Sequence, residues 1–193
     1  MTSAPEPPPN PTRRKQIIDA AREIAATEGW PAVTVRAIGA RIGCSAPAIY
    51  QYFSDKDEVL SALAEQAGAI LGVRLDSAAS ATHGSAKRVR AAVHALWDFA
   101  TENRELYAVI YGGDGLSPRG IGLVPGAMLR SVTKLSAKRG AESSAGDTAD
   151  RLAASVHGFI GLALGGNFPG GQARARKLCD AMVDDLIRGL GRD

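Results

Sequence analysis

Residues 34–60 read TVRAIGARIGCSAPAIYQYFSDKDEVL, and this stretch decides the fold. Its opening part has the form of a short helix, because Thr34 is a favoured N-cap residue and Gly43 is a favoured helix end. The apolar positions between these two residues recur at a spacing of three or four, as in a helix with one buried face. They are Val35, Ile38 and Ile42.

A second short helix follows almost at once. Ser45 suits its N-cap position, and Pro47 is tolerated in a first helical turn. Ile49 and Phe53 stand four residues apart and therefore face the same way, with Tyr50 beside them. Two short helices joined by so tight a turn predict a helix-turn-helix, a shape that lets its second helix enter the major groove of DNA.

The residues upstream predict one more helix and an arm. The segment 13–30, RRKQIIDAAREIAATEGW, carries apolar residues at helical spacing, namely Ile17, Ile18, Ala21, Ile24 and Ala25. Gly29 favours the end of that helix, and Pro31 does not continue it easily. Residues 1–12 are rich in proline and have no apolar periodicity, so we expect a disordered arm there.

The residues downstream predict further helices and no sheet. The polar turn 54–57 begins a fourth helix, whose apolar positions continue to Val73, and residues 76–85 predict a loop. Later helical patterns cover 89–100, 106–110, 128–135, 148–164 and 173–190, while 112–126 is too rich in Gly and Pro for a regular element. No segment alternates with period two, so we expect an all-α fold of about nine helices. We expect one domain over 13–56 and a second over 57–193.

The composition excludes several classes of protein. The chain has 193 residues, of which 45% are hydrophobic and 22% are charged, and this is typical of a globular protein. Cys44 and Cys179 fit neither a disulfide scaffold nor a structural zinc site, and they favour a reducing compartment. No apolar run approaches the roughly 18–20 residues that a membrane span needs, and residues 1–12 lack the apolar core of a signal peptide. We therefore expect a cytoplasmic protein without a membrane partner.

The stretch 34–60, with the helix of 13–30 before it, resembles the TetR family of bacterial transcription regulators. The shared features are Gly43 before the third helix, an Ile-Tyr-x-x-Phe core from Ile49 to Phe53, and a polar turn that leads to Lys56. The resemblance implies an N-terminal helix-turn-helix unit and a C-terminal helical domain for an effector and for dimerisation. It implies a ligand-responsive repressor that binds a palindromic operator on double-stranded DNA as a homodimer and is released by a small apolar effector.

Side-chain chemistry selects the residues that are suited to touch DNA. Small residues in the third helix let it approach base edges, Gln51 suits adenine, and Tyr50 and Tyr52 offer hydroxyls to phosphates. A phosphate contact by Lys56 comes from the resemblance alone. Residues 13–56 hold seven Lys or Arg and four Asp or Glu, so the net charge of +3 of the whole chain lies there. The candidate set is Arg13, Thr34, Val35, Arg36, Ser45, Ala46, Pro47, Ala48, Tyr50, Gln51, Tyr52 and Lys56.

Several of these residues also have a purely structural interpretation. Tyr50 equally suits a core position with its hydroxyl at the rim, as buried tyrosines often do. Arg36 and Arg41 suit an ordinary solvated helix surface, and Gln51 suits any exposed helix.

The middle helices predict an apolar pocket for the effector. The candidates are His94, Trp97, Tyr107, Ile110, Tyr111, Met128 and His157. The alternative is that these aromatic residues simply fill the core. The C-terminal half resembles TetR members named for a Trp-His-Gly motif, with Val156 standing where they have the tryptophan.

The last two predicted helices are the expected homodimer interface. The eighth is apolar around most of its circumference and the ninth has a wide apolar stripe, so both need cover from more than one side. By resemblance, the two helices pair with their copies in a four-helix bundle. The candidates are Val156, Phe159, Ile160, Ala163, Leu178, Met182 and Leu186.

No pattern in the sequence predicts an enzyme. The chain has no nucleophile elbow, no Walker loop and no zinc-protease motif, and its three histidines lack metal-ligand spacing. We therefore expect no catalytic residues, no cofactor and no metal. The alternative function is that of a small-molecule carrier or helical interaction protein that does not bind DNA.

Overall fold

The structure is a computed structural model that describes residues 11–112, 126–138 and 145–190. Within these ranges the chain forms nine α-helices, one short 3-10 helix and no strand, which confirms the all-α prediction. None of the helices in those ranges combines the length and the apolarity that crossing a bilayer would require. The expected arm falls almost wholly on residues 1–10, which lie outside the described residues.

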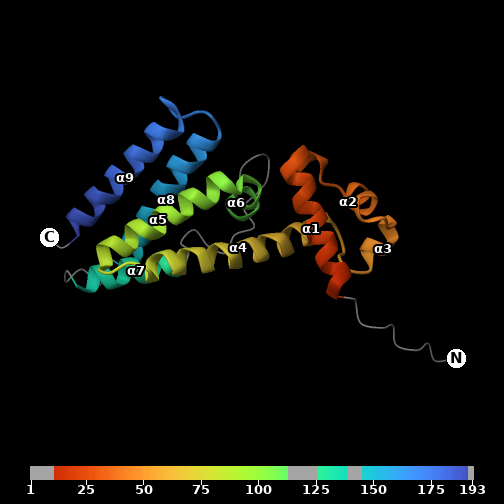
Figure 1. Cartoon of the computed structure of the whole chain (residues 1–193), viewed down its shortest axis with the longest axis horizontal. Coiled ribbons are helices and arrows are strands. Elements are labelled where there is room, and N and C mark those ends of the chain that lie inside the picture. The colour runs from red at the N-terminus through yellow and green to blue at the C-terminus, as the bar shows by residue number, and fades with distance from the viewer. Residues whose placement is uncertain (1–10, 113–125, 139–144, 191–193) are drawn as a thin grey trace.

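The N-terminal unit, residues 11–53, is the part that we call the headpiece. It contains α1 (Pro11–Glu28), η1 (Trp30–Ala32), α2 (Val35–Ile42) and α3 (Ala46–Tyr50). Its side chains meet in one apolar centre, which includes the buried residues Ile17, Ile24, Trp30, Ile38, Ile49 and Phe53. Figure 1 shows the headpiece at one end of the molecule, with α2 and α3 on its outer side.

The long helix α4 (Lys56–Ser80) leads from the headpiece into the rest of the molecule. Its start is capped twice, because Asp55 Oδ1 accepts from the Glu58 N–H at 2.8 Å and Glu58 Oε2 accepts from the Ser54 N–H at 2.6 Å. The bond from Ser54 also lowers the pKa of Glu58. Farther along, α4 packs against α1 and three later helices. In Figure 1 it is one continuous helix that runs below α5 and α6.

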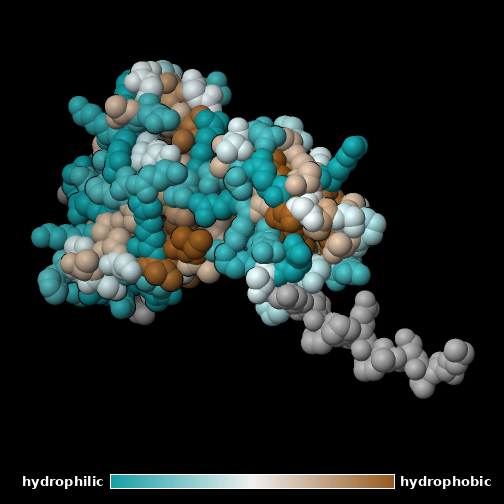
Figure 2. Space-filling view, turned by 45° about the vertical axis from the view of Figure 1, so that its right-hand side comes forward, coloured by the Kyte–Doolittle hydropathy of each residue, from teal (hydrophilic) through white to brown (hydrophobic). Residues whose placement is uncertain are grey.

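The remaining helices form, with α4, the core domain. They are α5 (Ser85–Glu102), α6 (Arg104–Tyr111), α7 (Gly126–Ala137), α8 (Ala145–Leu164) and α9 (Gly171–Gly189). α5 packs against α4 and α7, and α8 packs against α7 and α9. The face shown in Figure 2 is mostly hydrophilic, and hydrophobic residues come to its surface only in small patches.

A ladder of polar side-chain contacts joins α5 to α9. Arg90 Nε donates to Asp184 Oδ1 at 2.6 Å, and Arg176 Nη1 donates to Asp98 Oδ1 at 2.7 Å. Between these two rungs, His94 Nε2 lies 2.9 Å from Asp180 Oδ1. The paired residues are spaced by four on each helix, and their numbers rise along α5 while they fall along α9. α9 therefore lies antiparallel to α5 and turns its polar side toward α5.

Some expected helix boundaries are wrong. The loop predicted over 76–85 is helical as far as Ser80, because Leu75 and Ala79 are buried and their packing extends α4 through the small residues around them. α1 begins at Pro11 rather than at Arg13, and α3 ends at Tyr50, so that Phe53 lies beyond the end of the helix. The Gly- and Pro-rich segment lies, from residue 113 to 125, outside the described residues.

Candidate functional site

The turn between α2 and α3 is built by local hydrogen bonds. The Thr34 side chain accepts from the Ala37 N–H at 3.0 Å, which confirms its predicted role as the N-cap of α2. Gly43 ends the helix in the left-handed conformation, with φ of 66°, and the Cys44 N–H then donates to the Gly39 carbonyl at 2.9 Å. A non-glycine residue pays a steric cost in that conformation. Gly43 therefore sets the angle at which α3 leaves α2.

α3 is held by two side chains and exposes most of the others. Ile49 and Phe53 are buried in the apolar centre of the headpiece, which leaves the opposite side of the helix to solvent. Ser45, Pro47 and Gln51 are exposed, and Ala46, Ala48 and Tyr52 are half-buried. Tyr50 is 54% exposed, so the interpretation of Tyr50 as a core aromatic is wrong. Ser45 occupies the N-cap position, but its side chain makes no capping bond.

The basic residues of the headpiece and of the start of α4 differ in their surroundings. Arg41 is held by α1 through contacts of 2.7 Å to both Glu23 and Glu28, so its charge is neutralised within the protein. Arg14 lies over the Phe53 ring, with its Cζ 4.7 Å from the ring centroid. The candidate phosphate contacts Arg13, Arg36 and Lys56 lie in α1, at the start of α2 and at the start of α4. Arg36 is exposed, Arg13 and Lys56 are half-buried, and Val35 packs partly against the core.

Three of the predicted pocket residues form an aromatic cluster in the core domain. Tyr107 Oη lies 2.7 Å from His157 Nδ1, and the Tyr111 and His157 rings are 4.1 Å apart between centroids. Burial raises the pKa of both Tyr107 and Tyr111, so the two phenols stay protonated. The Tyr111 hydroxyl is buried and meets no hydrogen-bond partner in the described part of the chain. An unsatisfied hydroxyl beside an aromatic pair is suited to a polar group on an otherwise apolar ligand.

The other predicted pocket residues divide between core and surface. Trp97, Ile110 and Met128 are buried in the same apolar cluster that fills the core domain. The prediction for His94 is wrong, because its ring is exposed and lies against Asp180 in the ladder to α9. The physical reason is the position of its neighbours on α5, since Val93, Leu96 and Trp97 occupy the inward side of the helix.

The predicted dimer residues divide between the inside and the outside of the subunit. Val156, Ile160 and Ala163 are buried within the subunit, so their assignment to an interface is wrong, because they have no surface left to bury. The outward residues are Phe159, Met182 and Leu186, which are half-buried, and Leu178, which is 39% exposed. Leu162 is not in the candidate set, although it is 50% exposed and stands three residues after Phe159 on the outer side of α8. Its spacing from Phe159 was the available signal.

Among residues 11–112, 126–138 and 145–190, no group of three or more His, Cys, Asp or Glu side chains is arranged to hold an ion. Cys44 and Cys179 are free thiols, and burial raises the pKa of Cys179 to about 12.

Fold and site together define a helix-turn-helix protein whose headpiece is carried on a helical core domain. A family model described as bacterial regulatory proteins of the tetR family matches residues 17–63, and a model described as the tetracyclin repressor-like C-terminal domain matches residues 89–186. The chain belongs to the TetR family of bacterial regulators.

Individual relatives extend this comparison. The transcriptional activator FasR of Mycolicibacterium smegmatis is 34% identical over 108 residues, which are 55% of this chain and 48% of FasR. The repressor Rv1474c of Mycobacterium tuberculosis is 44% identical over 54 residues, 28% of this chain and 29% of that protein. The chain thus matches less than half of either curated relative. The solved structure of SCO4313, described as a regulatory protein, is 26% identical to this chain and superposes on it with a TM-score of 0.69. The matched part covers 91% of this chain and 95% of the SCO4313 chain.

Proposed function

We propose that the protein is a DNA-binding transcription regulator that acts as a homodimer on a palindromic operator. Residues 13–56 form the DNA-binding domain, and residues 57–193 form the domain that dimerises and binds an effector. The observation that carries this proposal is the outward side of α3, where Tyr50 is 54% exposed among small and polar side chains while Ile49 and Phe53 anchor the helix from behind. A helix anchored on one side and small-faced on the other is suited to the major groove.

Each DNA contact follows from position and chemistry. Ser45, Ala46, Pro47 and Ala48 allow the start of α3 to approach base edges, and the exposed amide of Gln51 is suited to adenine. The hydroxyls of Tyr50 and Tyr52 and the cations of Arg13, Arg36 and Lys56 contact phosphates. The Thr34 hydroxyl accepts a bond inside α2 but keeps its hydrogen to donate. Val35 contributes apolar contact beside it.

Dimerisation uses the outer sides of α8 and α9. Phe159, Leu162, Leu178, Met182 and Leu186 present apolar surface there, and Gly158 and Gly161 lie next to them with open space around their Cα atoms. Apolar side chains beside glycines favour close packing of one helix pair on its copy. A two-fold dimer then presents two copies of α3 to two half-sites.

The effector site is the Tyr107, Tyr111 and His157 cluster, with Trp97, Ile110 and Met128 as its apolar surroundings. An effector acts only if its affinity differs between the shape that fits DNA and the shape that does not. α4 joins the headpiece to this cluster, since it packs against both α1 and α6. A shift of α6 on ligand binding is therefore transmitted through α4 and changes the distance between the two α3 helices of the dimer.

We further propose that operator binding represses transcription and that the effector relieves it. A dimer seated on an operator blocks access to the promoter by its presence alone, whereas activation needs an additional contact with polymerase. The two curated relatives named above are one activator and one repressor. The position of the operator relative to the promoter determines whether a bound dimer represses or activates transcription.

Selection of bound duplexes from a random pool by the purified full chain tests the proposal. The expected result is a palindrome whose half-site centres are about 34–36 Å apart or a multiple of that spacing. A titration of the selected duplex across salt concentrations should show a steep loss of affinity. Recovery of no enriched sequence, with no duplex binding at low salt, would favour the carrier alternative.

A further inference from the structure

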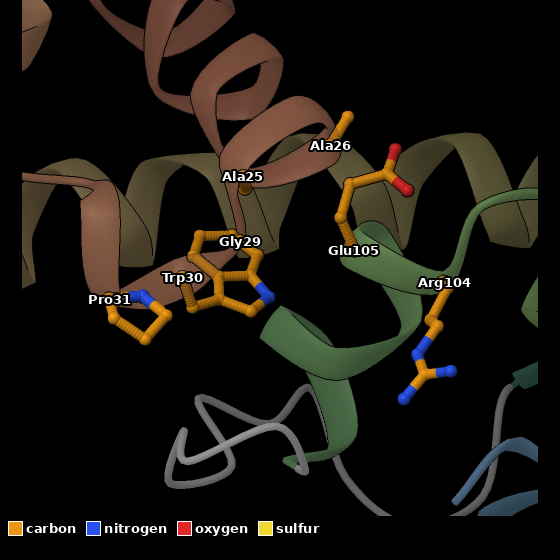
Figure 3. A pocket seen from close by; sticks show the side chains of 7 residues that line it. All are labelled: Ala25, Ala26, Gly29, Trp30, Pro31, Arg104 and Glu105. Carbon is orange, nitrogen blue, oxygen red and sulfur yellow. The ribbon is translucent and has the colours of Figure 1, made fainter.

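A cleft lies away from the aromatic cluster, where the headpiece meets the core domain (Figure 3). Its volume is about 350 Å³, within the range of about 300–1,000 Å³ that is typical of ligand pockets. One wall comes from the end of α1 and from η1, and the other comes from the first turn of α6. The residues that matter are Ala25, Gly29, Trp30, Pro31, Arg104 and Glu105. None of them has a part in the proposed contacts with DNA, effector or partner.

The first observation is a buried donor without an acceptor. Trp30 is 4% exposed, and its indole Nε1–H finds no acceptor within the described part of the chain. Buried N–H groups in proteins are almost always paired. Figure 3 shows this nitrogen on the edge of the indole that faces α6, across the cleft from Arg104 and Glu105. The donor is therefore directed at the place that a ligand would occupy.

The second observation is the uncapped start of α6. This helix begins at Arg104, and the side chain of Asn103 at its N-cap makes no capping bond, because Asn103 Oδ1 accepts from Arg22 and its Nδ2 donates to the Phe99 carbonyl. The first-turn amides of a helix attract an anion. Glu105 lies in the same turn, but its carboxylate accepts from Arg22 Nε at 3.3 Å, which offsets its charge. Arg104 lies on the rim of the cleft.

We propose that this cleft binds a small flat carboxylate, of the class of aryl carboxylates. The carboxylate accepts from Trp30 Nε1–H and lies at the start of α6, and the ring lies against Pro31 and Ala25. The indole nitrogen has almost no solvent-accessible surface, so binding includes a small separation of η1 from α6. Because η1 belongs to the headpiece and α6 to the core domain, such a ligand changes how the two parts are held together.

Tryptophan fluorescence tests this directly, because the chain has only Trp30 and Trp97. In the Trp97→Phe variant, Trp30 is the sole fluorophore. Titration of that variant with benzoate should give a saturable change in emission. Benzyl alcohol, which has the ring without the charge, should bind at least tenfold more weakly. No saturable change, or equal binding of the two compounds, would overturn the proposal.

Calorimetry on further variants locates the site. Trp30→Phe keeps an aromatic ring but removes the donor, and it should weaken benzoate binding at least tenfold relative to the wild type, whereas Trp97→Phe should not. Tyr111→Phe should leave benzoate affinity unchanged, and a loss there would place benzoate in the aromatic cluster and overturn the proposal. If circular dichroism shows that Trp30→Phe does not fold, Arg104→Gln is the test variant. It should weaken benzoate binding at least threefold, and an unchanged benzoate affinity would overturn the proposal. These measurements use no DNA, so they do not depend on the proposed function.

Discussion

Nε of Arg22 in α1 donates to Oε1 of Glu105 in α6 at 3.3 Å, across 83 positions of sequence. The same guanidinium donates through Nη2 to Asn103 Oδ1, also at 3.3 Å. One arginine of the headpiece therefore holds both the N-cap and the first turn of α6. The two charged side chains are 41% and 15% exposed, so the contact is only partly screened by water.

A double-mutant cycle on this pair should reveal a coupling free energy of about 0.5–1 kcal/mol, the upper range for partly exposed ion pairs. The variants are Arg22→Ala, Glu105→Ala and the double substitution, and urea unfolding gives the free energy of each. Lys15→Ala combined with Glu105→Ala is the control, because Lys15 pairs with Asp19 at 2.5 Å instead, and its effects should add. Additive effects for Arg22 and Glu105 would show that the pair contributes nothing.

Gly43→Ala should lower the free energy of unfolding by about 1–2 kcal/mol, the cost of the left-handed conformation for a residue with a Cβ. Gly43 has φ of 66°, and no other residue would lie within 4 Å of a Cβ added there, so the cost comes from the local backbone conformation and not from crowding by neighbouring residues. Gly72→Ala is the matched control within α4, where open space and helical geometry predict a gain of about 0.5–1 kcal/mol. A neutral effect at Gly43, measured by urea unfolding, contradicts the prediction.

Stability should fall as pH rises above about 10. Burial raises the pKa of Tyr107 and Tyr111 above the ordinary value of 10.0, so the unfolded chain releases these protons before the folded one does. Below pH 10 the stabilising contribution of the two protonated tyrosines is fully present. Above pH 10 each tyrosine lowers the free energy of unfolding by up to about 1.4 kcal/mol per pH unit. Urea unfolding between pH 9 and about 11 measures the slope. Tyr107→Phe and Tyr111→Phe should each reduce it, and an unchanged slope in both variants would refute the assignment.

Leu178→Glu should convert the proposed homodimer into monomers, because it buries a charge where two copies of α9 meet. Leu129→Glu is the matched control, since Leu129 lies on α7 and is 40% exposed, against 39% for Leu178. Light scattering coupled to size exclusion gives the mass of each variant. Dissociation of the Leu129 variant instead would indicate that the dimer interface lies on α7.

Lys56→Ala should weaken binding to all duplexes alike and reduce the slope of log K against log salt by about one for each subunit. Lys134→Ala, an exposed lysine of α7, is the control and should leave the slope unchanged. Gel-shift titrations of the selected duplex at several salt concentrations provide the slopes. A loss confined to one sequence would make Lys56 a base contact rather than a phosphate contact.

The sequence predicted the headpiece well because its signals are local. The N-cap of Thr34 and the left-handed Gly43 depend on residues within a few positions, and the spacing of Ile49 and Phe53 identifies the anchored side of α3. The extension of α4 to Ser80 was not predictable in this way. It depends on Leu75 and Ala79 finding neighbours in other helices, and small residues alone favour a loop just as well.

The core domain was harder to predict because its helices are apolar on several sides. Periodicity shows that α8 must be covered, but it does not say whether Val156 or Leu162 faces inward. The contact between Tyr107 and His157 joins residues 50 positions apart, and no local pattern encodes it. The unpaired indole nitrogen of Trp30 is visible only once α6 has been placed beside η1.

α4 spans its 25 residues without interruption, a length of about 37 Å at the rise of an α-helix. Because the helix is uninterrupted, a movement at one end is not taken up by bending between the two halves of the protein. α4 therefore moves as one rigid body. Tilting it by about 5° at the end near α7 displaces the end near α1 by about 3 Å. Modest rearrangements in one half of the protein are thereby amplified into displacements large enough to spoil alignment with successive turns of a duplex.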